Sequence, residues 1–117
     1  MKKNILFDKA LAFGVRTLKL AKLLKEQNQD IIAKQILRSG TSIGANIAES
    51  EYASSNADFV NKLQISRKEA SETRYWLYLL HEAQELDKKL FFSLCADLDE
   101  IIKILAASVV TVKNKSN

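Results

Sequence analysis

The stretch SSNADFVNKLQISRKEASETRYWLYLLHEAQEL, residues 54–86, decides the fold of this chain. It contains neither proline nor glycine, and its apolar or small residues recur at alternating steps of four and three. That spacing places them on one side of a long amphipathic helix that packs against other helices. The predicted seam consists of Phe59, Leu63, Ser66, Ala70, Thr73, Leu77 and Leu80.

Six consecutive apolar or aromatic residues, YWLYLL at positions 75–80, make part of this helix apolar on all sides. Only part of a helix can face its own bundle, so some of these side chains must lie elsewhere. Tyrosine and tryptophan are favoured at interfaces because they bury a large area and keep a polar group. Core packing and base stacking are the alternatives. We predict a subunit interface at Tyr75, Trp76, Tyr78 and Leu79.

Three further segments show similar spacing, so we expect helices at about 5–26, 31–53, 56–85 and 88–113. Short polar turns separate them, with Asp30, Ser55 and Asp87 as expected N-caps. The prediction is one all-α domain over residues 1–117, an up-down-up-down antiparallel four-helix bundle. The expected inward stripe of the first helix is Phe7, Leu11, Gly14, Leu18 and Ala21, widened by Val15 and Leu24.

The centre of the second helix, RSGTSIGAN at 38–46, is rich in glycine and hydroxyl residues. Each glycine costs about 1 kcal/mol relative to alanine inside a helix. Either these small residues let a neighbouring helix approach closely, or the helix bends here. The apolar spacing stays in phase from Ile32 to Ile47, which favours one helix, with or without a kink.

Composition narrows the class of protein. A chain of 117 residues fits one domain with a single core, and its lone cysteine, Cys95, cannot form an intramolecular disulfide. Charged residues interrupt the N-terminal segment MKKNILFDKALAFG, so it does not read as a signal peptide. No window approaches about 18 consecutive apolar residues, so no membrane association is expected. We expect a cytoplasmic protein.

Positive charge is concentrated in the first part of the chain. Residues 1–45 hold nine Lys and Arg against three acids, whereas residues 46–117 hold nine against eleven. This asymmetry favours an anionic partner, although solvated helix faces would show it too. The residues predicted to contact RNA or DNA phosphates, without reading sequence, are Lys9, Arg16, Lys19, Lys22, Lys34 and Arg38.

No stretch of the sequence indicates a reaction. Di-iron four-helix bundles carry Glu-x-x-His motifs, and the single histidine, His81, has Tyr78 three residues before it. Cys95 lies beside Leu94, where a small buried hydrophobic residue is expected rather than a nucleophile. We therefore expect no metal, no cofactor and no enzymatic activity.

From the phrase SIGANIAES at 42–50 onward, the chain resembles a bacterial family, the 23S rRNA intervening sequence proteins. These four-helix bundles are also similar to the accessory variability protein of diversity-generating retroelements. Nearly the whole chain takes part, although many relatives have proline where this chain has Gly44. The resemblance continues through Glu51, Ala53, Ser55, Asp58-Phe59, Lys62, Lys68-Glu69-Ala70, Glu72-Thr73 and Tyr75-Trp76-Leu77.

The resemblance implies a ring, typically a homopentamer, with no established catalytic activity. It also implies an association with nucleic acid, since some members are encoded inside inserts of ribosomal RNA genes. The retroelement relatives are basic pentamers that bind nucleic acid and a reverse transcriptase. Two functions stay open: a homo-oligomer that binds structured RNA or DNA through a basic surface, or an oligomeric adaptor for a protein partner.

A polar cluster within these phrases has two interpretations. It could grip a ligand or a base, or it could satisfy backbone groups and charges within or between subunits and so fix helix register. We favour the second interpretation. The cluster consists of Asn46, Glu49, Lys62, Lys68, Glu69 and Glu72.

Overall fold

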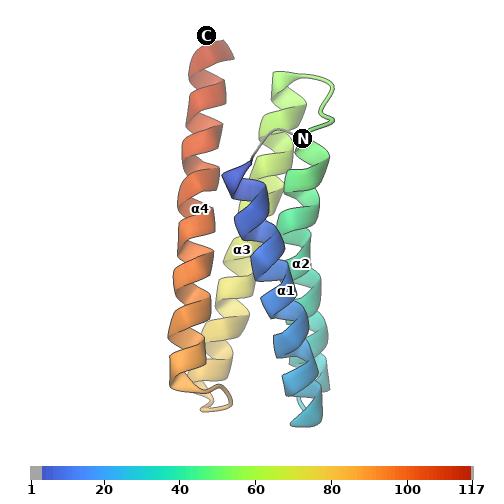
Figure 1. Ribbon diagram of the computed structural model, residues 1–117, viewed down its shortest axis with the longest axis vertical. Helices are drawn as coiled ribbons and strands as arrows, with labels where there is room; N and C mark the ends of the chain where they lie inside the picture. Colours follow the sequence, from blue (N-terminus) through green and yellow to red (C-terminus); the bar gives the residue numbers. More distant parts are fainter. Residues whose placement is uncertain (1–3, 117) are drawn as a thin grey trace.

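The computed structural model describes residues 4–116 and shows antiparallel helices side by side (Figure 1). They are α1 (Ile5–Glu26), α2 (Asp30–Ser50), α3 (Asn56–Glu82) and α4 (Lys88–Ser116). Helix α2 packs between α1 and α3, and α4 packs on α3 and, less closely, on α1. The predicted all-α four-helix bundle is confirmed, and the expected helix ends agree to within three residues. None of the helices within residues 4–116 combines the length and apolar character needed to cross a bilayer.

The α1–α2 and α3–α4 turns lie at one end of the bundle (Figure 1). Each contains a residue with positive φ, Asn28 at 63° and Gln84 at 59°. In each turn the following amide donates back into the last helical turn, Gln29 to the Leu24 carbonyl and Glu85 to the Leu80 carbonyl. This Schellman arrangement satisfies helix-end carbonyls and reverses the chain within a few residues, without glycine or proline.

Side-chain caps begin three of the helices. Asn4 Oδ1 accepts from the Phe7 amide, Ser55 Oγ from the Asp58 amide, and Asp87 Oδ2 from the Leu90 amide, each at 3.1 Å. The caps predicted at Ser55 and Asp87 are therefore confirmed. The cap predicted at Asp30 is wrong, because Asp30 already belongs to the first turn of α2. The turn that ends α1 runs directly into α2 there, and Asp30 lies in the first helical turn, where the helix dipole favours a negative charge.

The predicted stripe of α1 is wrong in part, because Leu11, Val15 and Leu18 are 45–57% exposed. Helix α1 carries two apolar stripes with nearly the same spacing, one residue apart, and a shift of one residue rotates a helix by about 100°. Phe7 and Gly14 are only partly buried. The stripe that enters the core is Leu6, Ala10, Phe13, Thr17, Leu20 and Leu24, joined by Ala21.

The other three helices each bury one apolar stripe. On α3 the whole predicted seam is buried except Phe59, which is half-buried against the core. Burying apolar side chains along a common axis supplies the main stabilisation of such a bundle. The remaining core side chains are Ala33, Ile36, Ile43 and Ile47 of α2 and Phe91, Leu94, Leu98, Ile101, Leu105 and Val109 of α4.

Helix α2 is one uninterrupted helix. The close approach of α1 explains why Gly40 lies in its middle. A Cβ atom built on Gly40 would lie 2.5 Å from Thr17 Cγ2 and 2.7 Å from Thr17 Oγ1, so only glycine fits without displacing Thr17. A Cβ on Gly44 would make ordinary contacts with Ala10, the nearest at 3.5 Å. Of the two interpretations of this segment, close helix packing is the one confirmed.

Candidate functional site

An apolar groove of about 330 Å³ runs along the outer side of the α1–α2 pair. Its α1 wall is bulky, with Leu11, Val15 and Leu18, whereas its α2 wall is made of small residues. We refer to it as the α1–α2 groove. An exposed, continuous apolar surface of this kind is typical of an interaction site. Its other lining residues are Phe7, Ala10, Gly14, Thr41, Gly44, Ala45 and Ala48.

Sequence reasoning missed this groove, although its signal was present. The bulky wall is the second apolar stripe of α1, which we assigned to the core. A helix with two apolar stripes has one more than its place in the bundle core requires, and this excess indicates an exposed apolar surface.

The residues predicted as a subunit interface lie on the outer side of α3. Tyr75, Tyr78 and Leu79 are 38–58% exposed, and we refer to them as the aromatic patch. Trp76 differs, because it packs on the core and its Nε1 donates to Glu72 Oε2 at 3.0 Å. Tyr78 also touches Phe91 of α4, with ring centroids 5.5 Å apart. Three of the four predicted side chains are thus available to a partner.

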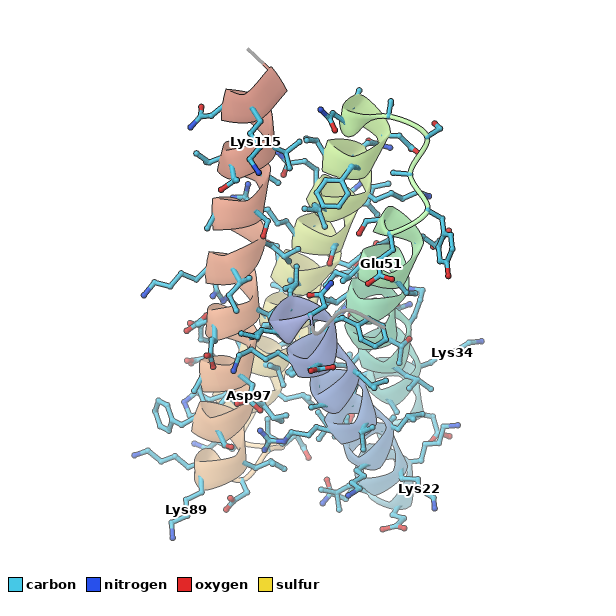
Figure 2. All side chains as sticks on the ribbon, turned by 45° about the horizontal axis from the view of Figure 1, so that its top comes forward. Lys22, Lys34, Glu51, Lys89, Asp97 and Lys115 are labelled. Atoms are coloured by element: carbon cyan, nitrogen blue, oxygen red, sulfur yellow. The ribbon has the colours of Figure 1, made fainter. Side chains whose placement is uncertain are left out.

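Half of the predicted nucleic-acid residues pair with acids of the same chain. Lys9 Nζ lies 2.9 Å from Glu100 Oε1, and Arg16 Nη1 lies 2.6 Å from Asp97 Oδ2, so both join α1 to α4. Figure 2 labels Asp97 on the side of α4 that faces α1. Arg38 pairs across the α2–α3 contact with Glu69, at 3.2 Å, and with Glu72. These pairs neutralise much of the expected basic surface.

The other three, Lys19, Lys22 and Lys34, are exposed and make no ion pair within residues 4–116. Lys22 and Lys34 project outward from α1 and α2 (Figure 2). Lys19 borders a shallow pocket between α1 and α4, beside Leu90. The six residues therefore do not form one continuous strip. Lys19, Lys22 and Lys34 form a set of free lysines, located in the half of the α1–α2 pair that is nearest to the α1–α2 turn.

The polar cluster lies along the α2–α3 contact. Asn46 Nδ2 donates to the Ser42 carbonyl at 2.8 Å, and Lys62 Nζ lies 3.5 Å from Glu49 Oε1. Glu69 and Glu72 receive Arg38, while Lys68 is exposed. The pairs of Lys62 with Glu49 and of Arg38 with Glu69 and Glu72 connect two helices of one chain, as the interpretation of the cluster as a register device requires. The Asn46 hydrogen bond stays within α2.

Two buried hydroxyl contacts lie behind this cluster. Thr73 Oγ1 is 2.8 Å from Ser39 Oγ, and Ser66 Oγ donates to the Ile43 carbonyl at 2.9 Å. Buried polar groups are tolerated when they are hydrogen-bonded, and each of these hydroxyls fixes α3 against α2 at one height. The α2–α3 contact is therefore specified by polar as well as apolar side chains.

The residues considered for catalysis, His81 and Cys95, are packed against other side chains. Within residues 4–116, no group of three or more His, Cys, Asp or Glu could hold a metal ion. His81 stacks on Phe91, with ring centroids 4.0 Å apart. Cys95 is half-buried rather than fully buried, and burial raises the pKa of its thiol, an effect that the positive charge of Arg74 partly offsets. A raised pKa keeps the thiol protonated and weakly nucleophilic at neutral pH.

Comparison with known proteins places this geometry in a family. The model of a family described as 23S rRNA-intervening sequence protein matches residues 2–107. A crystal structure from Bacteroides thetaiotaomicron VPI-5482, of a protein with unknown function from the S23 ribosomal protein family, is 49% identical, with a TM-score of 0.88. That match covers 90% of this chain and 98% of the other. Comparison with curated proteins finds no match. The chain belongs to the 23S rRNA-intervening sequence protein family.

Proposed function

We propose that this chain is a non-enzymatic subunit of a homo-oligomeric ring, pentameric as the family resemblance implies, which binds structured RNA or DNA. The observation that carries the proposal is the set of free lysines, Lys19, Lys22 and Lys34. A lysine without an intramolecular partner can neutralise a phosphate and release its counterion, which is the main source of sequence-independent affinity.

Association is required because one subunit offers few such lysines. Three phosphate contacts give weak binding that moderate salt abolishes. A ring repeats the set around its axis, so that contacts on one nucleic acid act together and raise the overall affinity. The α1–α2 groove and the aromatic patch support association, since both leave apolar surface exposed on a single subunit.

The test is binding of labelled double-stranded RNA and DNA, measured by fluorescence anisotropy at about 50 and 200 mM salt. The variant is Lys19→Gln with Lys34→Gln. Arg16 is left unchanged because it holds α4 through Asp97, and Lys22 because it borders the apolar surface of α1. The matched control is Lys103→Gln with Lys113→Gln, which removes the same charge from exposed positions of α4.

We expect wild-type binding to weaken steeply with salt. The slope of log affinity against log salt should fall by about 1 for each removed lysine that contacts a phosphate. The control should bind like the wild type. Equal losses in both variants would mean that only overall charge matters, and no binding at low salt would overturn the nucleic-acid function.

An oligomeric adaptor that binds a protein partner is the second candidate. The observation that favours it is the aromatic patch, whose tyrosines lack the neighbouring cations usual on single-strand binding surfaces, apart from Arg74, which pairs with Asp99. A stable ring that binds neither RNA nor DNA at low salt would support the adaptor. Salt-sensitive nucleic-acid binding would count against it.

A further inference from the structure

We propose that the α1–α2 groove of one subunit receives the aromatic patch on α3 of the next copy of this chain. The proposal rests on the homo-oligomer of the proposed function and names the surfaces that build it. The occupant is a second copy because both halves of a complementary contact are present on this one chain, on different helices.

The groove and the aromatic patch have complementary shapes. The α2 wall of the groove is formed by Gly44, Ala45 and Ala48, whose side chains leave space above the helix. The aromatic patch presents large side chains from adjacent turns of a single helix. Bulky side chains of one helix placed against small residues of another allow close packing, as Thr17 against Gly40 shows inside the subunit. The groove and the patch therefore fit as a concave and a convex surface.

The directions of the helices also suit this contact. Helices α1 and α3 run toward the same end of the bundle, where the two tight turns lie (Figure 1). In a ring built by rotation, all subunits point the same way along the axis. Helix α1 of one copy and α3 of the next would then be parallel, and a groove beside α1 can receive α3 without inverting a subunit.

Charged side chains on the two surfaces are complementary in one register. On α1, Val15, Leu18 and Lys22 follow one another at steps of three and four residues on the outer side. On α3, Tyr75, Tyr78 and Glu82 follow at the same steps, and all six side chains are exposed. Aligning the apolar members in parallel places the Glu82 carboxylate beside the Lys22 ammonium, and the residues described here offer neither an ion pair within the subunit. Such a pair adds specificity of register more than affinity.

This contact has a consequence for assembly. Because the groove and the patch are different surfaces, each subunit has one of each, and the contact is head-to-tail. Head-to-tail contacts close into a ring when the rotation permits. A contact between two identical grooves would instead stop at a dimer. Lys22 is used in the contact, which leaves Lys19 and Lys34 for phosphates.

The experiment uses two full-length variants that each block one surface, Ala45→Arg in the groove and Tyr75→Arg in the patch. Both positions are exposed, so the fold should survive, and far-ultraviolet circular dichroism checks this. The control is Ala107→Arg at an exposed position of α4. Mass is measured by light scattering after size exclusion, for each variant alone and for an equimolar mixture.

We expect each blocked variant to be monomeric and the mixture to form a dimer and nothing larger. The Ala45→Arg chain keeps a patch and the Tyr75→Arg chain keeps a groove, so one contact forms and cannot propagate. Blocked variants that stay monomeric when mixed, or that assemble like the wild type, would overturn this pairing while leaving the oligomer intact. A wild type that is monomeric at all concentrations would overturn the oligomer of the proposed function.

The mixed dimer also allows a test of register. Lys22→Glu in the chain that supplies the groove should raise the Kd about twofold to fivefold, the range for an exposed ion pair. Glu82→Lys in the chain that supplies the patch should have the same effect. Combining the two should restore the original Kd, and failure to restore it would show that another register is used.

Discussion

On its α3 side, helix α2 is bordered by ion pairs, whereas on its α1 side it is bordered by an apolar groove. The α3 side is complete within one subunit, with Ser39 and Thr73 in contact inside and Arg38 bridging to Glu69 outside. The α1 side is packed just as closely inside, through Gly40, but along its outer edge the groove is lined by apolar and small side chains and Thr41. The difference teaches that the outer edge of a helix contact, more than its buried centre, distinguishes a surface closed by polar side chains from one that stays apolar and exposed.

The largest loss of stability is expected where α1 and α2 pack most closely, at Gly40. Gly40→Ala places a Cβ inside the Thr17 side chain, and the overpacking outweighs the gain in helix propensity, for a net loss of about 1–2 kcal/mol in the free energy of unfolding. Gly14→Ala is the control, because its Cβ would meet nothing within 4 Å, and it should stabilise by up to about 1 kcal/mol. Urea unfolding at one fixed protein concentration measures both. If Gly40→Ala stabilised the chain as much as Gly14→Ala, α1 and α2 would be able to move apart at little cost.

A loss of similar size is expected for the inner part of the α3 side. Thr73→Val keeps the shape of the side chain but leaves the buried Ser39 hydroxyl without its Thr73 contact, which should cost about 1–2 kcal/mol. Adding Ser39→Ala should recover part of this loss, since no polar group is then left unpaired. A double-mutant cycle by chemical unfolding gives the coupling. Additive losses would show that the two hydroxyls do not depend on each other.

The smallest effect concerns the outer edge of the α3 side. Arg38→Gln removes the pairs with Glu69 and Glu72 and should cost about 0.5 kcal/mol, because Arg38 is exposed. The cost should shrink in high salt, which screens exposed pairs. Lys34→Gln, one turn earlier on α2 and without an ion pair among residues 4–116, is the control and should change little. A loss that is equal in low and high salt would point to packing by the Arg38 stem instead.

The sequence predicted most of the fold because most helices carry a single apolar stripe. On α3, Leu63, Ala70 and Leu77 have no rival set at the same spacing, so the seam was unambiguous. Ser55 and Asp87 were predictable as caps because their side chains reach the amide three residues later.

The rotation of α1 in the bundle, and which basic residues form ion pairs, could not be predicted in the same way. Two stripes on α1 compete, and the choice depends on Thr17 meeting Gly40, a contact between two helices that spacing within either one does not reveal. Arg16 and Asp97 lie 81 positions apart, so their pairing follows only from the order of helices around the bundle. The interface predicted at Tyr75, Trp76, Tyr78 and Leu79 remains a prediction, and all of these side chains except Trp76 are exposed.

The contact between α1 and α4 determines how the bundle closes as it folds. The other helix contacts join neighbours along the chain through short turns, whereas this one brings together the most distant segments and relies on Lys9–Glu100 and Arg16–Asp97. Long-range contacts carry the largest loop-closure cost and tend to form late. Helices α1 and α4 are therefore expected to dock on each other last and to separate first. Faster amide hydrogen exchange in α4, which then keeps only its contact with α3, than in α2 or α3 would reveal this order.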